Sequence, residues 1–189
     1  MQHLPNLISV CRLATAPVIL VLAWHGYSRV VLGVLVASFA SDVLDGYLAR
    51  RYGQTSEFGA RLDSLGDFII YITIPMAWWL LWPDSARHAA PYIIAVIASV
   101  TIPPLIAFCK FHAITSYHTR LAKLAALLIG GSALLIFAGG PAWPFRVATP
   151  VSCIAALEEI AITLTLTERR SNVRSLWGVI RQRKSRVDL

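Results

Sequence analysis

SDVLDGYLARRYGQTSEFGARLDSLGD, residues 41–67, places four aspartates between two apolar stretches of the chain. The first apolar stretch runs from Arg29 to Ser41, and the second begins directly after Asp67. At membrane depth a carboxylate costs at least about 2–3 kcal/mol, so such a group normally faces a cavity, a partner or a metal ion. If the flanking stretches cross a membrane, the segment between them is therefore the first candidate for a functional site.

The composition of the chain favours a membrane protein. Of its 189 residues 57% are hydrophobic and only 14% are charged, and its mean hydropathy is +0.63. Soluble domains average about 25% charged residues. The net charge of +7 comes from basic residues grouped in short segments between apolar runs, which is typical of a cytoplasmic membrane face and not of a nucleic-acid interface. We expect membrane lipid as a partner and no nucleic acid.

Six apolar segments are close to the length that a bilayer requires. A hydrocarbon core of about 30 Å needs roughly 17–25 helical residues. The sequence thus predicts an all-α integral membrane protein with a bundle of six transmembrane helices. One domain spans residues 1–167 and a basic cytoplasmic tail spans 168–189. The expected spans are 7–25, 29–50, 59–82, 89–111, 119–140 and 146–167.

The distribution of positive charge predicts the orientation. On this reading, one side of the membrane holds 14 of the 17 Lys and Arg residues, and only Arg29, Arg87 and Arg146 lie on the other. Cytoplasmic loops carry the excess of positive charge, so both termini are expected to be cytoplasmic, as an even number of spans requires. We expect an integral protein of a bacterial inner (plasma) membrane, with its site facing the cytoplasm.

Helical spacing predicts that the four aspartates converge. Asp42 and Asp45 are three residues apart, and Asp63 and Asp67 are four apart, so each pair shares a helix face. The two helices run antiparallel around a cytoplasmic loop near 51–58, which places Asp42 and Asp67 each about 12 Å from the loop. Four neighbouring carboxylates would repel one another without a counter-charge. They suit Mg²⁺ or Mn²⁺, as one ion or two.

Small residues and one arginine accompany the aspartates. Gly46, Ala49, Gly59 and Gly66 lie on or beside the same faces, where they allow either close helix approach or room for a ligand. Arg50 has three possible roles: pairing with a carboxylate, reaching the membrane interface, or binding a phosphate. Its place at the edge of the acidic cluster favours phosphate.

Together these residues form a recognisable pattern. The pattern D-x2-D-G-x2-A-R-x8-G-x3-D-x3-D resembles the signature of the CDP-alcohol phosphatidyltransferases. This family transfers a substituted phosphate from a CDP-linked donor to an alcohol and releases CMP. All eight positions of the signature are present, as Asp42, Asp45, Gly46, Ala49, Arg50, Gly59, Asp63 and Asp67.

The resemblance implies a role for each position. Asp42, Asp45, Asp63 and Asp67 would bind two divalent ions, Mg²⁺ or Mn²⁺, on the donor pyrophosphate, and Asp67 would also be the general base for the acceptor hydroxyl. The CMP moiety would be lined by Gly46, Ala49, Arg50 and Gly59. The resemblance further implies CDP-diacylglycerol as the donor, a place in phospholipid biosynthesis, and a homodimer.

The acceptor alcohol is less well defined. Lys110, Arg120 and Lys123 lie near the junction of the fourth and fifth spans, where cations could bind a phosphorylated acceptor such as glycerol 3-phosphate. They could equally reflect the cytoplasmic excess of positive charge. Phosphatidylglycerophosphate synthases often carry Gly-Lys-x-x-Thr near this junction, whereas this chain has Thr119-Arg120-Leu121-Ala122-Lys123.

Other functions remain open from the sequence. The segment 56–65 is also similar to phosphatidylserine synthases, and the signature is compatible with other CDP-alcohol phosphotransferases. A divalent-cation transporter is a more distant alternative, because the aspartates gather toward one face and not at the bilayer midplane. Glu158 and Glu159 in the sixth span receive no role; they fit either half-buried side chains that pair with a basic residue or an interface.

Overall fold

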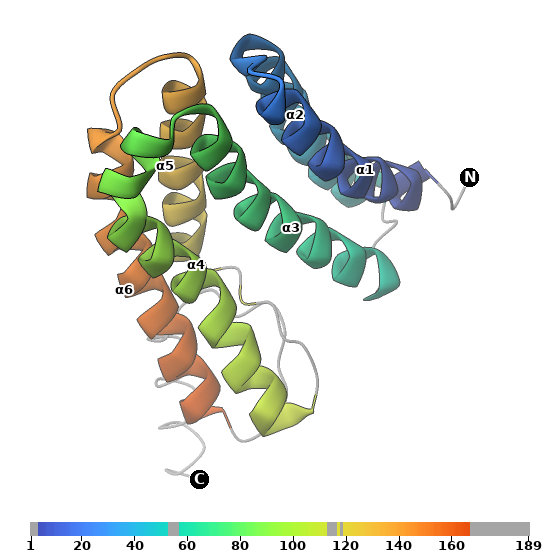
Figure 1. The fold of residues 1–189 in the computed structure, drawn as a ribbon. Helices are drawn as coiled ribbons and strands as arrows, with labels where there is room; N and C mark the ends of the chain where they lie inside the picture. The colour runs from blue at the N-terminus through green and yellow to red at the C-terminus, as the bar shows by residue number, and fades with distance from the viewer. Residues whose placement is uncertain (1–3, 53–56, 113–116, 118, 167–189) are drawn as a thin grey trace, which may run out of the picture. The chain divides into compact units, whose positions relative to one another are not determined.

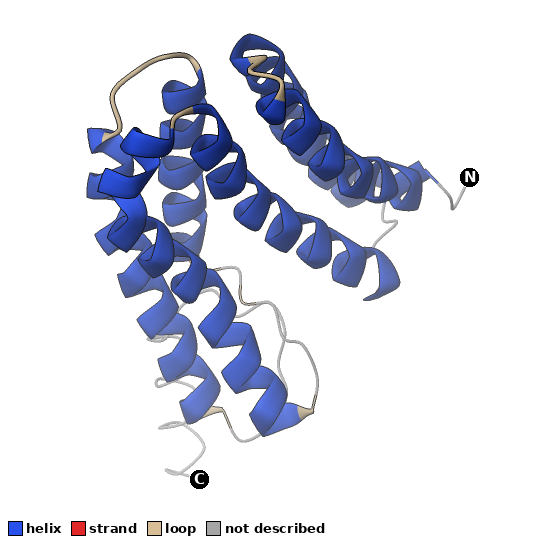
Figure 2. Ribbon diagram, viewed as in Figure 1, coloured by secondary structure: helices blue, strands red, loops and turns tan. Residues whose placement is uncertain are grey.

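In a computed structural model, the described part of the chain forms six α-helices (Figure 1). The model describes the backbone of residues 4–52, 57–112, 117 and 119–166, and the side chains of 14–41, 66, 68–112, 117 and 119–166. Within these ranges every regular element is a helix and no strand occurs, as Figure 2 shows. The helices are α1 (Leu4–Trp24), α2 (Ser28–Tyr52), α3 (Glu57–Leu81), α4 (Pro83–Phe111), α5 (Arg120–Phe137) and α6 (Trp143–Thr165).

All six predicted segments form helices, but several begin earlier than expected, α4 by six residues and α1 and α6 by three each. α4 begins at Pro83 instead of residue 89, and α6 begins at Trp143 instead of residue 146. Proline fits the first turn of a helix, because the N–H group that it lacks would have no partner inside the helix there. Pro83 and Pro144, which lie between the expected spans, therefore stand in the first turns of α4 and α6.

Three of the helices have the length and composition needed to cross a membrane. They are α4, α5 and α6, and shorter apolar stretches cover 14–24, 28–41 and 68–81 of the described side chains. Large apolar side chains are exposed along these helices, for example Ile94 and Leu127 at 67% and 72%. Water would disfavour such surfaces, whereas lipid would not. The fold is thus all-helical, with the apolar surface of an integral membrane protein.

The chain divides into two compact units. The first comprises Met1–Ala90 with Ala133–Pro141, and the second comprises Pro91–Ser132 with Ala142–Leu189. In the first unit α1 packs against both α2 and α3. Its core holds Ile19 of α1, Leu35 of α2 and Trp78 of α3, all nearly or fully buried. This packing holds the two helices that carry the aspartates against a common neighbour.

Helices α1 and α5 end in the same kind of glycine turn. After α1 the Gly26 N–H donates to the Ala23 carbonyl (3.0 Å) and the Tyr27 N–H to the Leu22 carbonyl (2.9 Å). After α5 the Gly139 N–H bonds Ile136 in the same way, and the Gly140 N–H bonds Leu135. This pair of bonds defines a Schellman motif, whose first residue past the cap is left-handed. Gly26 and Gly139 accordingly have φ of +78° and +86°.

We expect Gly26→Ala and Gly139→Ala each to destabilise the protein by about 1 kcal/mol, because a side chain at positive φ strains the backbone. Nothing lies within 4 Å of a Cβ at either position, so the backbone alone causes the effect. For a chain of this size, thermal unfolding in detergent should show a fall of about 2–4 °C. Gly33→Ala and Gly131→Ala are matched controls, since both sites are helical and open. An equal fall in the controls would contradict the assignment.

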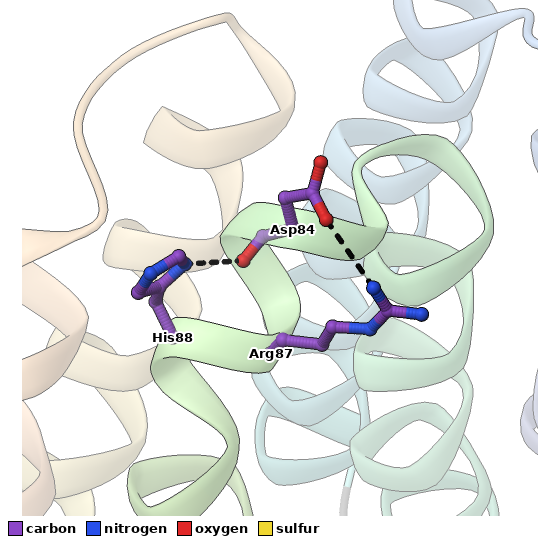
Figure 3. A network of polar contacts seen from close by, with 3 residues as sticks. All are labelled: Asp84, Arg87 and His88. Carbon is purple, nitrogen blue, oxygen red and sulfur yellow. Dashed lines mark hydrogen bonds and ion pairs between the residues drawn. The ribbon is translucent and has the colours of Figure 1, made fainter.

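The first turn of α4 carries its own polar network (Figure 3). Arg87 Nη1 lies 3.4 Å from Asp84 Oδ1, and His88 Nδ1 lies 2.7 Å from the Asp84 carbonyl oxygen. The Arg87 guanidinium also lies 5.9 Å from the centre of the Trp79 ring. Asp84 is thus an exposed aspartate with a local partner.

In the second unit α4 and α6 run parallel and in register. The Arg146 guanidinium lies 5.7 Å from the centre of the Tyr92 ring, Ser99 Oγ lies 2.7 Å from Ser152 Oγ, and Lys110 reaches the carbonyl oxygen of Thr163. The two residues of each pair are 53 or 54 positions apart in the sequence. Because this offset stays nearly constant, α4 and α6 run in the same direction. Along α4, Tyr92 and Lys110 are about 27 Å apart, close to the thickness of a hydrocarbon core of about 30 Å.

The serine contact joins the two helices at the middle of this length. Ser99 Oγ donates to the Val96 carbonyl at 2.7 Å, so the hydrogen between the two serines comes from Ser152. Polar bonds of this kind hold membrane helices together, because lipid offers no competing partner. The α4–α6 pair is thus connected at both ends and in between.

Candidate functional site

The motif aspartates lie on two continuous helices. α2 extends through Asp42 and Asp45 to Tyr52, and α3 begins at Glu57 and extends through Asp63 and Asp67. The helical spacing of each pair is therefore confirmed. The side chains of all four lie outside the described part of the structure, as do those of Gly46, Ala49, Arg50 and Gly59. Gly66, next to Asp67, is described and buried.

The chemistry of the four aspartates fits a divalent metal. A set made only of carboxylate oxygens suits Mg²⁺ or Mn²⁺, while zinc sites normally include His or Cys. No three His, Cys, Asp or Glu side chains gather among those that the structure describes. The motif thus remains the candidate metal centre of the chain.

Two of the three predicted acceptor residues share one helical turn. Arg120 and Lys123 are exposed in the first turn of α5, three residues apart and so on one face. The buried side chain of Thr119 caps this turn, accepting a hydrogen bond from the Ala122 N–H at 3.0 Å. This turn holds no acidic residue. Two cations at a helix N-terminus are unfavourable on their own, so this turn is suited to an anion.

The third predicted acceptor residue is engaged elsewhere. Lys110 Nζ donates to the carbonyl oxygens of Thr163 and Leu164, both at 2.9 Å. These carbonyls belong to the last turn of α6, which has no further helical N–H groups to satisfy them. Lys110 therefore caps α6 from the end of α4. The contact joins residues 53 positions apart, so sequence spacing could not reveal it.

Tyr117 is a residue that the sequence analysis missed. It is 6% exposed and forms a small core with Ile162 and Leu166, against which Phe111 packs. Its hydroxyl lies 3.3 Å from Thr163 Oγ1, which also lies 3.0 Å from the Glu159 carbonyl oxygen. A tyrosine in a short polar segment between two apolar helices was the only available signal.

The two glutamates of α6 are half-buried neighbours. Glu158 and Glu159 lie one to two turns before the end of the helix, close to the Thr163 contact. Their positions agree with the half-buried alternative.

His112, which follows α4, has φ of +50° and donates its N–H to the Phe108 carbonyl at 2.8 Å. Histidine adopts this left-handed conformation more readily than most residues, and here it ends the helix.

Comparison with known proteins adds an independent observation to this geometry. The family model described as CDP-alcohol phosphatidyltransferase matches residues 2–167, which include all six helices. The chain belongs to this family. This match confirms, over most of the chain, the resemblance seen in the eight motif positions. The members of the family are enzymes. No solved structure matches it.

Several curated relatives carry related names. A CDP-diacylglycerol–glycerol-3-phosphate 3-phosphatidyltransferase from Rickettsia typhi is 29% identical over 68% of this chain and 72% of its own length. A chloroplast protein of that name from Oryza sativa is 41% identical, over 40% of this chain and 23% of its own. A rat cardiolipin synthase (CMP-forming) is 38% identical over 48% of this chain and 34% of its own. This chain thus spans much of the bacterial relative but only part of the other two.

Proposed function

We propose that the protein transfers the phosphatidyl group of CDP-diacylglycerol to an alcohol and releases CMP, with glycerol 3-phosphate as the acceptor. The proposal is carried by the complete eight-residue motif on α2 and α3, inside the region that matches the family. It assigns the donor to the four aspartates and their neighbours. It assigns the acceptor to the cationic first turn of α5.

The donor chemistry follows from the motif. Asp42, Asp45, Asp63 and Asp67 would hold divalent ions, Mg²⁺ or Mn²⁺, which stabilise negative charge on the pyrophosphate as CMP leaves. Arg50 would bind a phosphate oxygen, and Gly46, Ala49 and Gly59 would leave space for the CMP moiety. An alcohol is a weak nucleophile near neutral pH, so Asp67 would accept the proton of the acceptor hydroxyl as the new P–O bond forms.

Two observations support a phosphorylated acceptor. Arg120 and Lys123 present two exposed cations at a helix N-terminus, a combination that binds phosphate well. The relatives from Rickettsia typhi and Oryza sativa are both named for glycerol 3-phosphate. The rat relative, named as a cardiolipin synthase, favours a second candidate in which the acceptor is itself a phospholipid.

The same proposal includes a topology. Six spans with both termini and the active site on the cytoplasmic side would place Lys110, Arg120 and Lys123 at the inner interface. The parallel course of α4 and α6 supports this, because it puts Arg146 at one end of the pair and Lys110 at the other. We further propose the bacterial inner membrane as the location and a homodimer as the assembly. Cysteine labelling from either side of sealed vesicles tests the topology.

The proposed function is tested by an acceptor screen. Purified protein receives CDP-diacylglycerol and Mg²⁺ or Mn²⁺, and CMP release is measured with glycerol 3-phosphate, phosphatidylglycerol, serine and inositol phosphate in turn. We expect glycerol 3-phosphate to give the highest rate. Turnover with phosphatidylglycerol alone would favour the cardiolipin synthase, and turnover with serine alone would favour the phosphatidylserine synthase-like alternative. Metal flux without CMP release would indicate a transporter.

Removing either cation of α5 should weaken binding of a phosphorylated acceptor. We expect Arg120→Gln and Lys123→Met each to raise the KM for glycerol 3-phosphate by about tenfold or more, since a charge-assisted hydrogen bond contributes about 1.5–3 kcal/mol. The KM for CDP-diacylglycerol should change little. Steady-state kinetics with each substrate varied in turn checks this. A rise only in the KM for the donor would contradict the assignment.

A further inference from the structure

In the second unit, the ammonium group of Lys110 lies at the C-terminal ends of both α4 and α6. Because α4 and α6 run parallel, their C-terminal ends lie together, and each carries a partial negative charge. Lys110 lies in the last turn of α4 and donates to the carbonyl oxygens of Thr163 and Leu164 in α6. Its charge therefore compensates its own helix and its neighbour at once. Two of its three N–H groups are used in doing so.

Thr163 contacts both Lys110 and Tyr117, and Tyr117 lies just before α5. Its carbonyl accepts from Lys110, while its hydroxyl lies 3.3 Å from the Tyr117 hydroxyl. Thr163 and Tyr117 are buried, at 0% and 6% exposure. Two residues after Tyr117, the fully buried Thr119 caps the turn that presents Arg120 and Lys123. Contacts thus lead from the exposed Lys110 through the buried Thr163 to Tyr117, which lies two residues before the cap of the turn that carries Arg120 and Lys123.

We propose that Lys110 is a positioning residue of the acceptor side, which holds Tyr117, Thr119 and the first turn of α5 in place by capping α6. This proposal rests on the proposed function for its acceptor. It separates the three cations by role: Arg120 and Lys123 bind the acceptor phosphate, and Lys110 supports the turn that carries them. It also gives Tyr117 a part in the same arrangement, through the hydroxyl of Thr163.

A double-mutant cycle tests the proposal. The variants are Lys110→Met, Tyr117→Phe and the pair, since Tyr117→Phe removes only the hydroxyl from the other side of Thr163. We expect each single variant to lower the midpoint of thermal unfolding in detergent by about 2–4 °C. Each should also raise the KM for glycerol 3-phosphate by about three- to tenfold, and the double variant should fall short of the sum because the sites share one network. Hydrogen exchange at the last amides of α6 should become faster in all three.

Two further variants separate positioning from direct binding. Lys110→Arg keeps a cationic donor and should restore most of the thermal midpoint and the KM. Lys123→Met should raise the KM without lowering the midpoint or exposing the α6 amides, because Lys123 is exposed. The proposal is overturned if Lys110→Met behaves like Lys123→Met, or if its effects add fully to those of Tyr117→Phe. The unfolding and exchange measurements need no acceptor, so a failure of the proposed function would leave them decisive.

Discussion

Asp67→Asn should reduce CMP release by about 10²–10⁴-fold, the range expected when a general base is lost. The amide is nearly the same size as the carboxylate but cannot accept a proton from the acceptor hydroxyl. Asp67 also belongs to the proposed metal set, so the loss should lie toward the upper end of that range. Steady-state assays with CDP-diacylglycerol and glycerol 3-phosphate measure the effect. The thermal midpoint should stay within a few degrees of the parent's, since the α3 helix itself is retained.

Asp84→Asn is the matched control for this variant. Asp84 is also an aspartate near a helix end, but its side chain is 88% exposed and pairs with Arg87 within the first turn of α4. It lies outside the eight-residue motif, so its replacement should leave turnover unchanged. Unaltered turnover in Asp67→Asn, or equal losses in both variants, would remove Asp67 from the role of general base.

Removal of divalent metal should abolish turnover altogether. The proposed convergence of four carboxylates requires a counter-charge, and the leaving CMP needs its developing charge stabilised. After exhaustive chelation we expect CMP release at background level, and restoration on addition of Mg²⁺ or Mn²⁺. Full activity in the chelated protein would contradict a metal centre at the motif.

Direct binding measurements extend this prediction beyond turnover. Mn²⁺ binding, followed by paramagnetic resonance, should be present in the parent and in Asp84→Asn. It should be weakened or lost in Asp42→Asn, because that substitution removes a charged ligand from the set. Equal Mn²⁺ binding in all three proteins would place the metal elsewhere.

Much of the fold could be read from the sequence because it depends on local chemistry. The apolar runs are long enough to predict six helices, and all six occur. Helix boundaries are less accurate next to proline, since Pro83 and Pro144 lie between the predicted spans but stand in the first turns of α4 and α6. Gly26 lies between two predicted spans and Gly139 at the end of another, and both form helix-ending turns because glycine adopts positive φ with little strain.

The candidate sites differ in how much of their arrangement could be predicted from the sequence. The motif aspartates are three or four residues apart, so helical periodicity alone places each pair on one face. Arg120 and Lys123 obey the same rule and share the first turn of α5. Lys110 looked equivalent to them in the sequence, because a charge near a membrane interface has the same signature whether it binds a ligand or caps a helix.

The sequence by itself determined the aspartate motif, the helical segments and the family, because each depends on residues close together or on their composition. Only the tertiary structure decided that α4 and α6 run parallel, that Lys110 caps α6 and that Tyr117 contacts Thr163. Those contacts join residues 46 to 54 positions apart. The Lys110 contact arises because two helix ends of like partial charge are packed together and need a cation, a requirement that appears only once the helices are side by side.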